Sequence, residues 1–137
     1  GQSRIAYFPG DLDRTFWQIM SPDHGRLLKN TIRWALGEEP IVTVNCPGVI
    51  DVTTWRQEKS MTVHLVNLTN PMMMKGPIRE IIPTGPHRVR LRLPKGAAAR
   101  KVQLLTAGTT PDVRTDNGTL TVVVPSVDVH EVVAIDL

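Results

Sequence analysis

The sequence predicts a mainly β protein, an antiparallel β-sandwich of about seven strands preceded by one strand and one α-helix. After Pro40, short runs of alternating apolar and polar residues recur, and clusters of Pro, Gly, Asn and Asp separate them. No helical pattern lies between these runs, which favours antiparallel pairing. Residues 1–39 differ in character, and they supply the expected leading strand and helix.

The expected leading strand is Arg4–Phe8, which Pro9-Gly10 ends. A polar turn is expected at Asp11–Arg14. A strand followed by a helix cannot bury its apolar faces alone, and this order is typical of an open α/β sheet. We therefore expect residues 1–39 to be the remnant of an α/β domain and residues 40–137 to be the sandwich.

The helix is predicted over Pro22–Leu36. Ser21 can cap the free backbone N–H groups, and Pro22 has a φ angle already suited to the first helical position. Apolar residues then recur at three- and four-residue spacing, which creates one apolar face. Gly37 provides the stop.

Seven strands are predicted after this helix. They are Ile41–Asn45, Ile50–Arg56, Met61–Leu68, Arg88–Leu93, Val102–Thr106, Leu120–Val124 and Glu131–Asp136. In Arg88–Leu93, three apolar side chains alternate with three arginines, as in a strand with one buried face. Asn117-Gly118 predicts a tight hairpin, because both residue types tolerate positive φ.

Composition excludes several classes of protein. The chain has 137 residues, a formal net charge of +3 and a single cysteine, so it has no internal disulfide framework and no multi-cysteine zinc site. No apolar run approaches the ~18 residues of a membrane span, and Gly1–Arg4 lacks the apolar region of a secretory signal. A cytoplasmic protein without cofactor or metal is therefore expected.

The positive charge is concentrated in one segment. Residues 79–101 contain seven basic residues and one acid, whereas residues 102–137 contain one base and five acids. The two segments are expected to pair as neighbouring strands of complementary charge, and the alternative is a basic exposed edge strand. Nucleic-acid binding is disfavoured, because no aromatic residue lies between these arginines to stack on bases.

Several stretches resemble one family of proteins. Arg4–Trp17 (RIAYFPGDLDRTFW), Ser21–Leu28 (SPDHGRLL) and Ile32–Leu36 (IRWAL) resemble the end of the amidotransferase-like domain of bacterial glycoside-hydrolase-like proteins, the hypothetical glycosyl hydrolases and β-galactosidases with a trimerisation domain. Val49–Gln57, Met61–Asn70 and Val129–Leu137 resemble the C-terminal β domain of the same proteins.

This resemblance implies a parent protein whose barrel hydrolyses glycosidic bonds with two carboxylates. The catalytic residues would lie in that barrel, so no residue of this chain is assigned a catalytic role. The expected function is a non-catalytic accessory or scaffold domain. Its expected partners are the parent's barrel and amidotransferase-like domain, with self-association of the isolated chain and no nucleic-acid or membrane partner.

Five residues are candidates for interdomain or subunit contacts: Phe16, Trp17, Met72, Met73 and Met74. The three consecutive methionines lie between Asn70-Pro71 and Gly76-Pro77 and fit no regular strand. Methionine is adaptable and suits a packing surface. Packing of this loop against its own core is favoured, and contact with the parent's other domains or another subunit is the alternative. In the isolated chain the methionine segment is expected to be among the largest exposed apolar features.

The alternative function is a carbohydrate-binding module with Trp55 as its platform. Sugars stack on flat aromatic faces, and Trp55 lies at a strand end beside Arg56 and Gln57. Residues 41–137 contain no other Trp, Tyr or Phe, whereas a sugar platform commonly uses two or three. A third hypothesis, a free-standing enzyme, would use Asp11, Asp13 and His24.

The remaining chemically active side chains have simpler interpretations. Asp11 and Asp13 could hold a divalent cation, but turn capping and pairing with Arg14 are favoured. His64 is expected to point to solvent or to the outer face of its sheet. Cys46 is expected to be a structural thiol, because no cation or helix N-terminus near it in sequence would lower its pKa.

Overall fold

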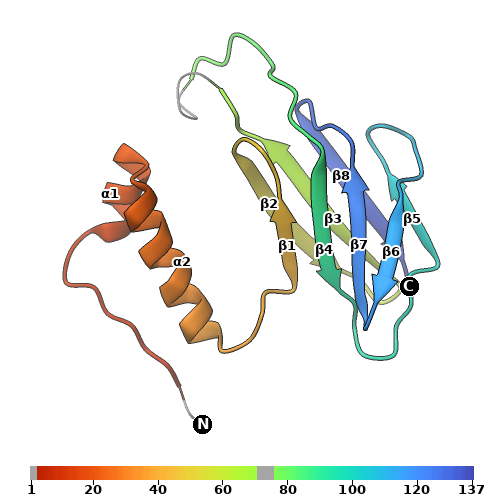
Figure 1. Cartoon of the computed structure of the whole chain (residues 1–137), viewed down its shortest axis with the longest axis horizontal. Helices are drawn as coiled ribbons and strands as arrows, with labels where there is room; N and C mark the ends of the chain where they lie inside the picture. Colours follow the sequence, from red (N-terminus) through yellow and green to blue (C-terminus); the bar gives the residue numbers. More distant parts are fainter. Residues whose placement is uncertain (1–2, 71–75) are drawn as a thin grey trace. The chain divides into compact units, whose positions relative to one another are not determined.

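A computed structural model of the chain describes residues 3–70 and 76–137 (Figure 1). It contains two helices and eight strands and divides into two compact units, Gly1–Pro40 and Ile41–Leu137. The strands form two four-stranded antiparallel sheets, so the predicted mainly β sandwich is confirmed.

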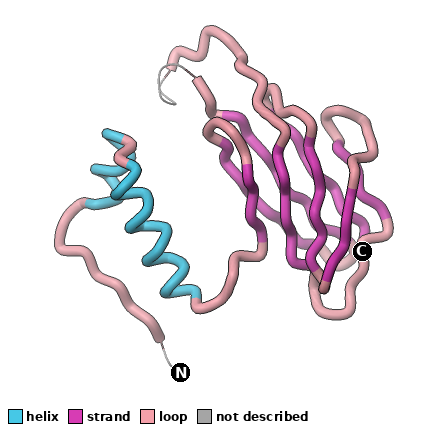
Figure 2. Tube along the Cα trace, viewed as in Figure 1, coloured by secondary structure: helices cyan, strands magenta, loops and turns pink. Residues whose placement is uncertain are grey.

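The first unit contains helices α1 (Leu12–Ile19) and α2 (Pro22–Leu36). The expected strand at Arg4–Phe8 is wrong: these residues are loop, as Figure 2 shows. A strand needs a hydrogen-bonding partner strand, and residues 3–40 contain none. The expected polar turn at Asp11–Arg14 is also wrong, because it is the beginning of α1.

Helix α2 has the predicted bounds. It ends at Leu36, and the capping residue Gly37 has a left-handed φ of 72° and donates its N–H to the Arg33 carbonyl. Ser21 occupies the N-cap position, but its side chain makes no capping hydrogen bond, so that detail of the prediction is wrong. Met20 has a left-handed φ of 51° and separates the two helices.

Sheet A has the strand order β1-β4-β7-β6. Its strands are β1 (Val42–Asn45), β4 (His87–Arg92), β7 (Thr119–Val124) and β6 (Val113–Asp116). Sheet B has the order β2-β3-β8-β5. Its strands are β2 (Ile50–Arg56), β3 (Ser60–Asn67), β8 (His130–Asp136) and β5 (Lys101–Leu104).

Strand β6 was not predicted, and it brings the number of strands from the expected seven to eight. All four of its residues are exposed, and only Val113 is apolar, because β6 is an edge strand that pairs with β7 alone. The β6–β7 hairpin turns through Asn117 and Gly118, with φ angles of 47° and 73°. The hairpin predicted from these two residues is therefore confirmed.

The core lies between the two sheets. It consists of alternate residues from the inner faces of β3, β4, β5, β7 and β8, together with residues from adjoining loops. The buried members are Met61, Val63, Leu65, Val89, Leu91, Leu93, Val102, Leu104, Leu120, Val122, Val124, Val127, Val133 and Ile135.

The expected pairing of opposite charges on neighbouring strands fails at Arg88 and Arg90 of β4. Strands β4 and β7 do pair, but Arg88, Arg90 and Arg92 stand opposite Val123, Thr121 and Thr119. Because β4 lies between β1 and β7, the basic edge-strand interpretation is wrong as well. Opposite charges do face one another in sheet B, where Lys101 of β5 stands across from Asp136 of β8.

Candidate functional site

A depression of about 740 Å³ lies at one end of the sandwich. Two buried core residues, Met61 and Leu93, line it together with the basic side chains Arg56 and Lys95. Trp55 also lines it and is 64% exposed. The register sets Trp55 opposite Thr62 on the outward face of sheet B, so the indole lies at the border of the depression.

At this end of the sandwich, the Trp55 indole can stack on a flat apolar ligand, and Arg56 and Lys95 can place positive charges beside it. An exposed indole provides an apolar face with little loss of conformational entropy. Arg56 and Lys95 add hydrogen-bond donors and positive charge. Trp55 is the sole Trp, Tyr or Phe of residues 41–137, so the platform consists of a single ring.

A second depression, of about 520 Å³, lies over the outer face of sheet A. Three arginines line it: Arg88 and Arg90 from β4, and Arg114 from β6. The acid among its lining residues is Asp116. Sequence reasoning recognised the arginines as one face of a strand, but it did not place Arg114 beside them, since β6 was not predicted.

Two histidines meet on the outer face of sheet B. His64 of β3 and His130 of β8 have nearly parallel rings with centroids 5.4 Å apart, and His64 Nδ1 lies 3.2 Å from His130 Nε2. The Thr62 hydroxyl lies 3.2 Å from His64 Nε2. His64 is therefore on the outward face, as expected, but it has a partner that the sequence did not reveal.

The series Thr62, His64 and His130 has the order of a nucleophile, a base and an orienting group. However, Thr62 and His64 lie on β3, a central strand paired on both sides with β2 and β8. The backbone N–H groups of such a strand are engaged in the sheet, so they cannot converge on a developing oxyanion. The arrangement therefore supports packing of the sheet face more than catalysis.

In the helical unit, Phe16 and Trp17 have different environments. A Cβ atom added at Gly25 would fall 2.8 Å from Cε2 of the Phe16 ring, so this ring packs closely against α2. Trp17, the next residue, is 56% exposed. Of these two interface candidates, Trp17 thus presents the larger share of its surface to solvent.

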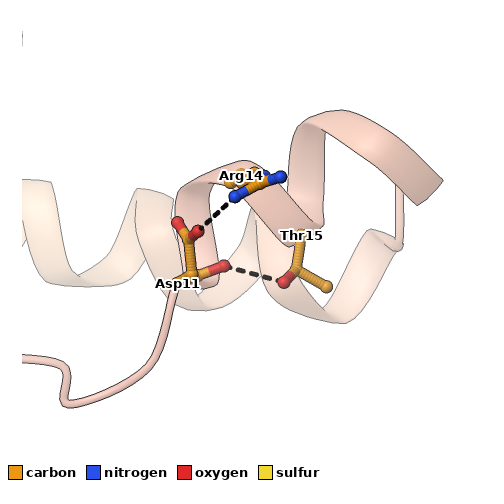
Figure 3. A network of polar contacts seen from close by, with 3 residues as sticks. All are labelled: Asp11, Arg14 and Thr15. Carbon is orange, nitrogen blue, oxygen red and sulfur yellow. Dashed lines mark hydrogen bonds and ion pairs between the residues drawn. The ribbon is translucent and has the colours of Figure 1, made fainter.

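Asp11 is the N-cap residue of α1, and its side chain makes no capping hydrogen bond. Figure 3 shows its polar contacts: an Arg14 guanidinium nitrogen lies 3.5 Å from the carboxylate, and the Thr15 hydroxyl donates to the Asp11 carbonyl at 2.7 Å. The favoured pairing of Asp11 with Arg14 is therefore observed. Such an exposed pair contributes little to stability.

His24 lies in the first turn of α2, half-buried, and its Nδ1 atom is buried without a hydrogen-bond partner. Across residues 3–70 and 76–137, no group of three or more His, Cys, Asp or Glu side chains could hold a metal ion. Asp11, Asp13 and His24 are thus not part of such a group.

Cys46 follows β1 and is half-buried. Burial raises the pKa of its thiol, which disfavours the reactive thiolate.

The interface candidates Met72, Met73 and Met74 lie outside the residues that the structure describes.

Glu131 is a buried carboxylate that the sequence did not single out. It is 3% exposed and lies on the inner face of β8, opposite Leu65. Its Oε1 accepts hydrogen bonds from the Thr106 and Val132 N–H groups, both at 2.8 Å, and its Oε2 accepts one from Ala107 at 3.0 Å. The carboxylate thereby fastens the turn after β5 to β8.

Asn67, the last residue of β3, has a similar structural role. Its Nδ2 donates to the carbonyls of Ile82, Val127 and Asp128 at 2.8, 3.2 and 2.8 Å. Its Oδ1 accepts from the Thr69 N–H at 3.0 Å. No periodic pattern marks a residue whose partners are backbone groups far away in sequence, so sequence reasoning missed it.

None of the helices in the described part of the chain is long and apolar enough to cross a membrane.

No protein-family model matches the sequence, and no curated protein matches it either. The structure, however, is similar to that of alpha-L-fucosidase isoenzyme 2 from Paenibacillus thiaminolyticus, with a TM-score of 0.74 and 20% identity, over 91% of this chain and 19% of that chain.

The structural likeness to this fucosidase shows that the chain shares the fold of the matched part. The matched share exceeds that of residues 41–137 alone, so the match extends into the helical unit. The chain spans about a fifth of the length of that fucosidase.

Proposed function

We propose that this chain is a non-catalytic accessory or scaffold part of a glycoside-hydrolase-like protein. Its fold resembles part of a fucosidase chain, and it spans 19% of that chain. The two carboxylates that hydrolyse a glycosidic bond belong, in this proposal, to a barrel elsewhere in the parent protein. The role of the chain is then to support contacts between domains or subunits.

The observation that carries the proposal is the absence of buried residues in the helical unit. None of residues 3–40 is buried, although this segment contains Ile5, Tyr7, Trp17, Ile32 and Trp34, each more than half exposed. Exposed apolar groups in a unit without buried residues support the proposal of an interaction surface. We infer that the rest of the parent polypeptide covers them, and that the isolated chain self-associates through them.

Sedimentation velocity of the chain tests this inference. We expect concentration-dependent dimers or larger species, which the double variant Trp17→Ser/Trp34→Ser suppresses. Trp55→Ser is the control, because it removes a similarly exposed indole from the sandwich and should leave association unchanged. A monomer at all reachable concentrations, or equal loss of association in the control, would contradict the inference.

A glycosidase assay of the same preparation tests the non-catalytic role. We expect no hydrolysis of aryl-glycoside substrates, α-L-fucoside included. Hydrolysis that persists through purification would overturn the accessory-domain proposal, because the chain would then hold its own catalytic acid and nucleophile.

A carbohydrate-binding role is the second candidate, favoured by the depression beside Trp55. We expect any neutral oligosaccharide that binds there to lose affinity in Trp55→Ala and to keep it in Trp34→Ala. Titration calorimetry distinguishes the two variants. Equal affinities in wild type and Trp55→Ala would remove this candidate.

A further inference from the structure

The outer face of sheet A carries arginines at fixed positions. Side chains of β4 alternate, so Arg88 and Arg90 are exposed while Val89 and Leu91 are buried in the core. The backbone of β4 is held from both sides, by β1 and by β7. The Cα atoms of Arg88 and Arg90 therefore lie about 7 Å apart along the strand.

A third arginine joins them across the sheet. Thr121 of β7 stands between Arg90 of β4 and Arg114 of β6, each of which is its direct cross-strand partner. Two strand spacings separate the Cα atoms of Arg90 and Arg114 by about 10 Å. Together with Arg88, they line the depression of about 520 Å³ on this face.

These three arginines have no anionic partner among the described residues. The ion pairs Arg14–Asp11 and Arg26–Asp23, both shorter than 4 Å, lie in the helical unit. Asp116 lines the same depression, so three positive charges and one negative charge leave a formal charge of +2. Neutral hydrogen-bonding residues also line the depression: Thr43, Asn45, Thr119 and Thr121.

We propose that this face, the arginine face, binds an acidic polysaccharide whose charges are sugar carboxylates. A guanidinium group binds a carboxylate with two parallel hydrogen bonds. The hydroxyls of Thr43 and Thr121 and the amide of Asn45 both donate and accept hydrogen bonds, as sugar hydroxyls require. A charge of +2 diluted by neutral polar groups matches one charge per sugar better than a phosphodiester or densely sulfated chain.

Nucleic acid fits the arginine face less well. Proteins that bind single-stranded nucleic acid without sequence preference stack its bases on aromatic side chains. The arginine face has no such ring, since Trp55 is the sole Trp, Tyr or Phe of residues 41–137 and lies on the outward face of the other sheet. This proposal is independent of the scaffold role, because it uses none of the residues of the helical unit.

Affinity electrophoresis of the chain in gels containing polygalacturonate tests the proposal. We expect retardation of the wild type and a loss of affinity of at least about tenfold in Arg90→Ser/Arg114→Ser, since two charge-assisted contacts are removed. The control Arg100→Ser/Lys101→Ser removes the same charge from exposed positions of the same unit and should stay within about twofold of wild type. Thermal unfolding verifies that both double variants are folded.

Further arms of the experiment separate carboxylate recognition from general charge attraction. We expect a carboxyl-reduced polymer to cause no retardation, and Arg90→Lys/Arg114→Lys to bind with intermediate affinity because lysine lacks the bidentate geometry. Trp55→Ala should bind as wild type does. The proposal is overturned by no binding, by equal loss in the control variant, by tighter binding of heparin or single-stranded DNA, or by a loss that follows Trp55.

Discussion

The helical unit and the sandwich are built from similarly apolar sequence, yet they use their apolar residues in opposite ways. The sandwich buries fourteen hydrophobic side chains in one cluster between its sheets. Residues 3–40 bury none, although both helices have an apolar face. The sandwich can therefore be stable by itself. In the proposed scaffold role, the helices gain their stability from a covering surface, because helix stability in proteins comes mainly from packing.

The largest expected effect that tests this contrast comes from a matched pair of leucines. Leu65→Ala removes a fully buried side chain from β3 and should lower the free energy of unfolding of the sandwich by about 3 kcal/mol. Leu27→Ala in α2 shortens a side chain that is 45% exposed and should change it by less than about 0.5 kcal/mol. Urea denaturation measures both, and equal effects would contradict the contrast.

A second test concerns the polar attachment inside the sandwich. Glu131→Ala leaves three backbone N–H groups without their carboxylate acceptor, and we expect a loss of about 2–3 kcal/mol. The control Asp128→Ala removes an exposed carboxylate of the neighbouring turn and should cost less than about 1 kcal/mol. An unchanged denaturation midpoint in Glu131→Ala would refute the attachment described here.

The smallest effect is expected at the β6–β7 hairpin. Gly118 has a φ of 73°, and no atom lies within 4 Å of the position that a Cβ would occupy. Gly118→Ala should therefore cost about 1 kcal/mol through backbone strain alone. Gly118→Asn should cost less, because asparagine tolerates left-handed φ. Thermal unfolding compares the two, and a larger cost for asparagine would indicate a steric origin instead.

How much could be predicted from sequence differs between the same two units. Alternation in Arg88–Leu93 and the turn residues Asn117-Gly118 are local signals, so the sandwich and its hairpin were predictable. The leading strand at Arg4–Phe8 was predicted from composition, but composition cannot supply the partner strand that a β-strand requires. Strand β6 was missed because an exposed edge strand does not need an apolar face.

The candidate sites were less predictable, because they arise from register. Arg114 joins Arg90 only through Thr121 on the strand between them. His64 meets His130, which lies 66 residues further along the chain. Glu131 and Asn67 bind distant backbone groups, which carry no mark in the sequence. A single residue type at one position therefore predicts its face of a sheet, but not its neighbours.

Native-state hydrogen exchange of the chain, at concentrations below any self-association, compares the stabilities of the helical unit and the sandwich. We expect the amides of β3 and β8 to exchange by global unfolding, and those of α2 to exchange at least about a thousandfold faster, with little protection. Protection of α2 as strong as that of β3 would contradict this difference between the two units, because the helices would then be stable without a partner surface.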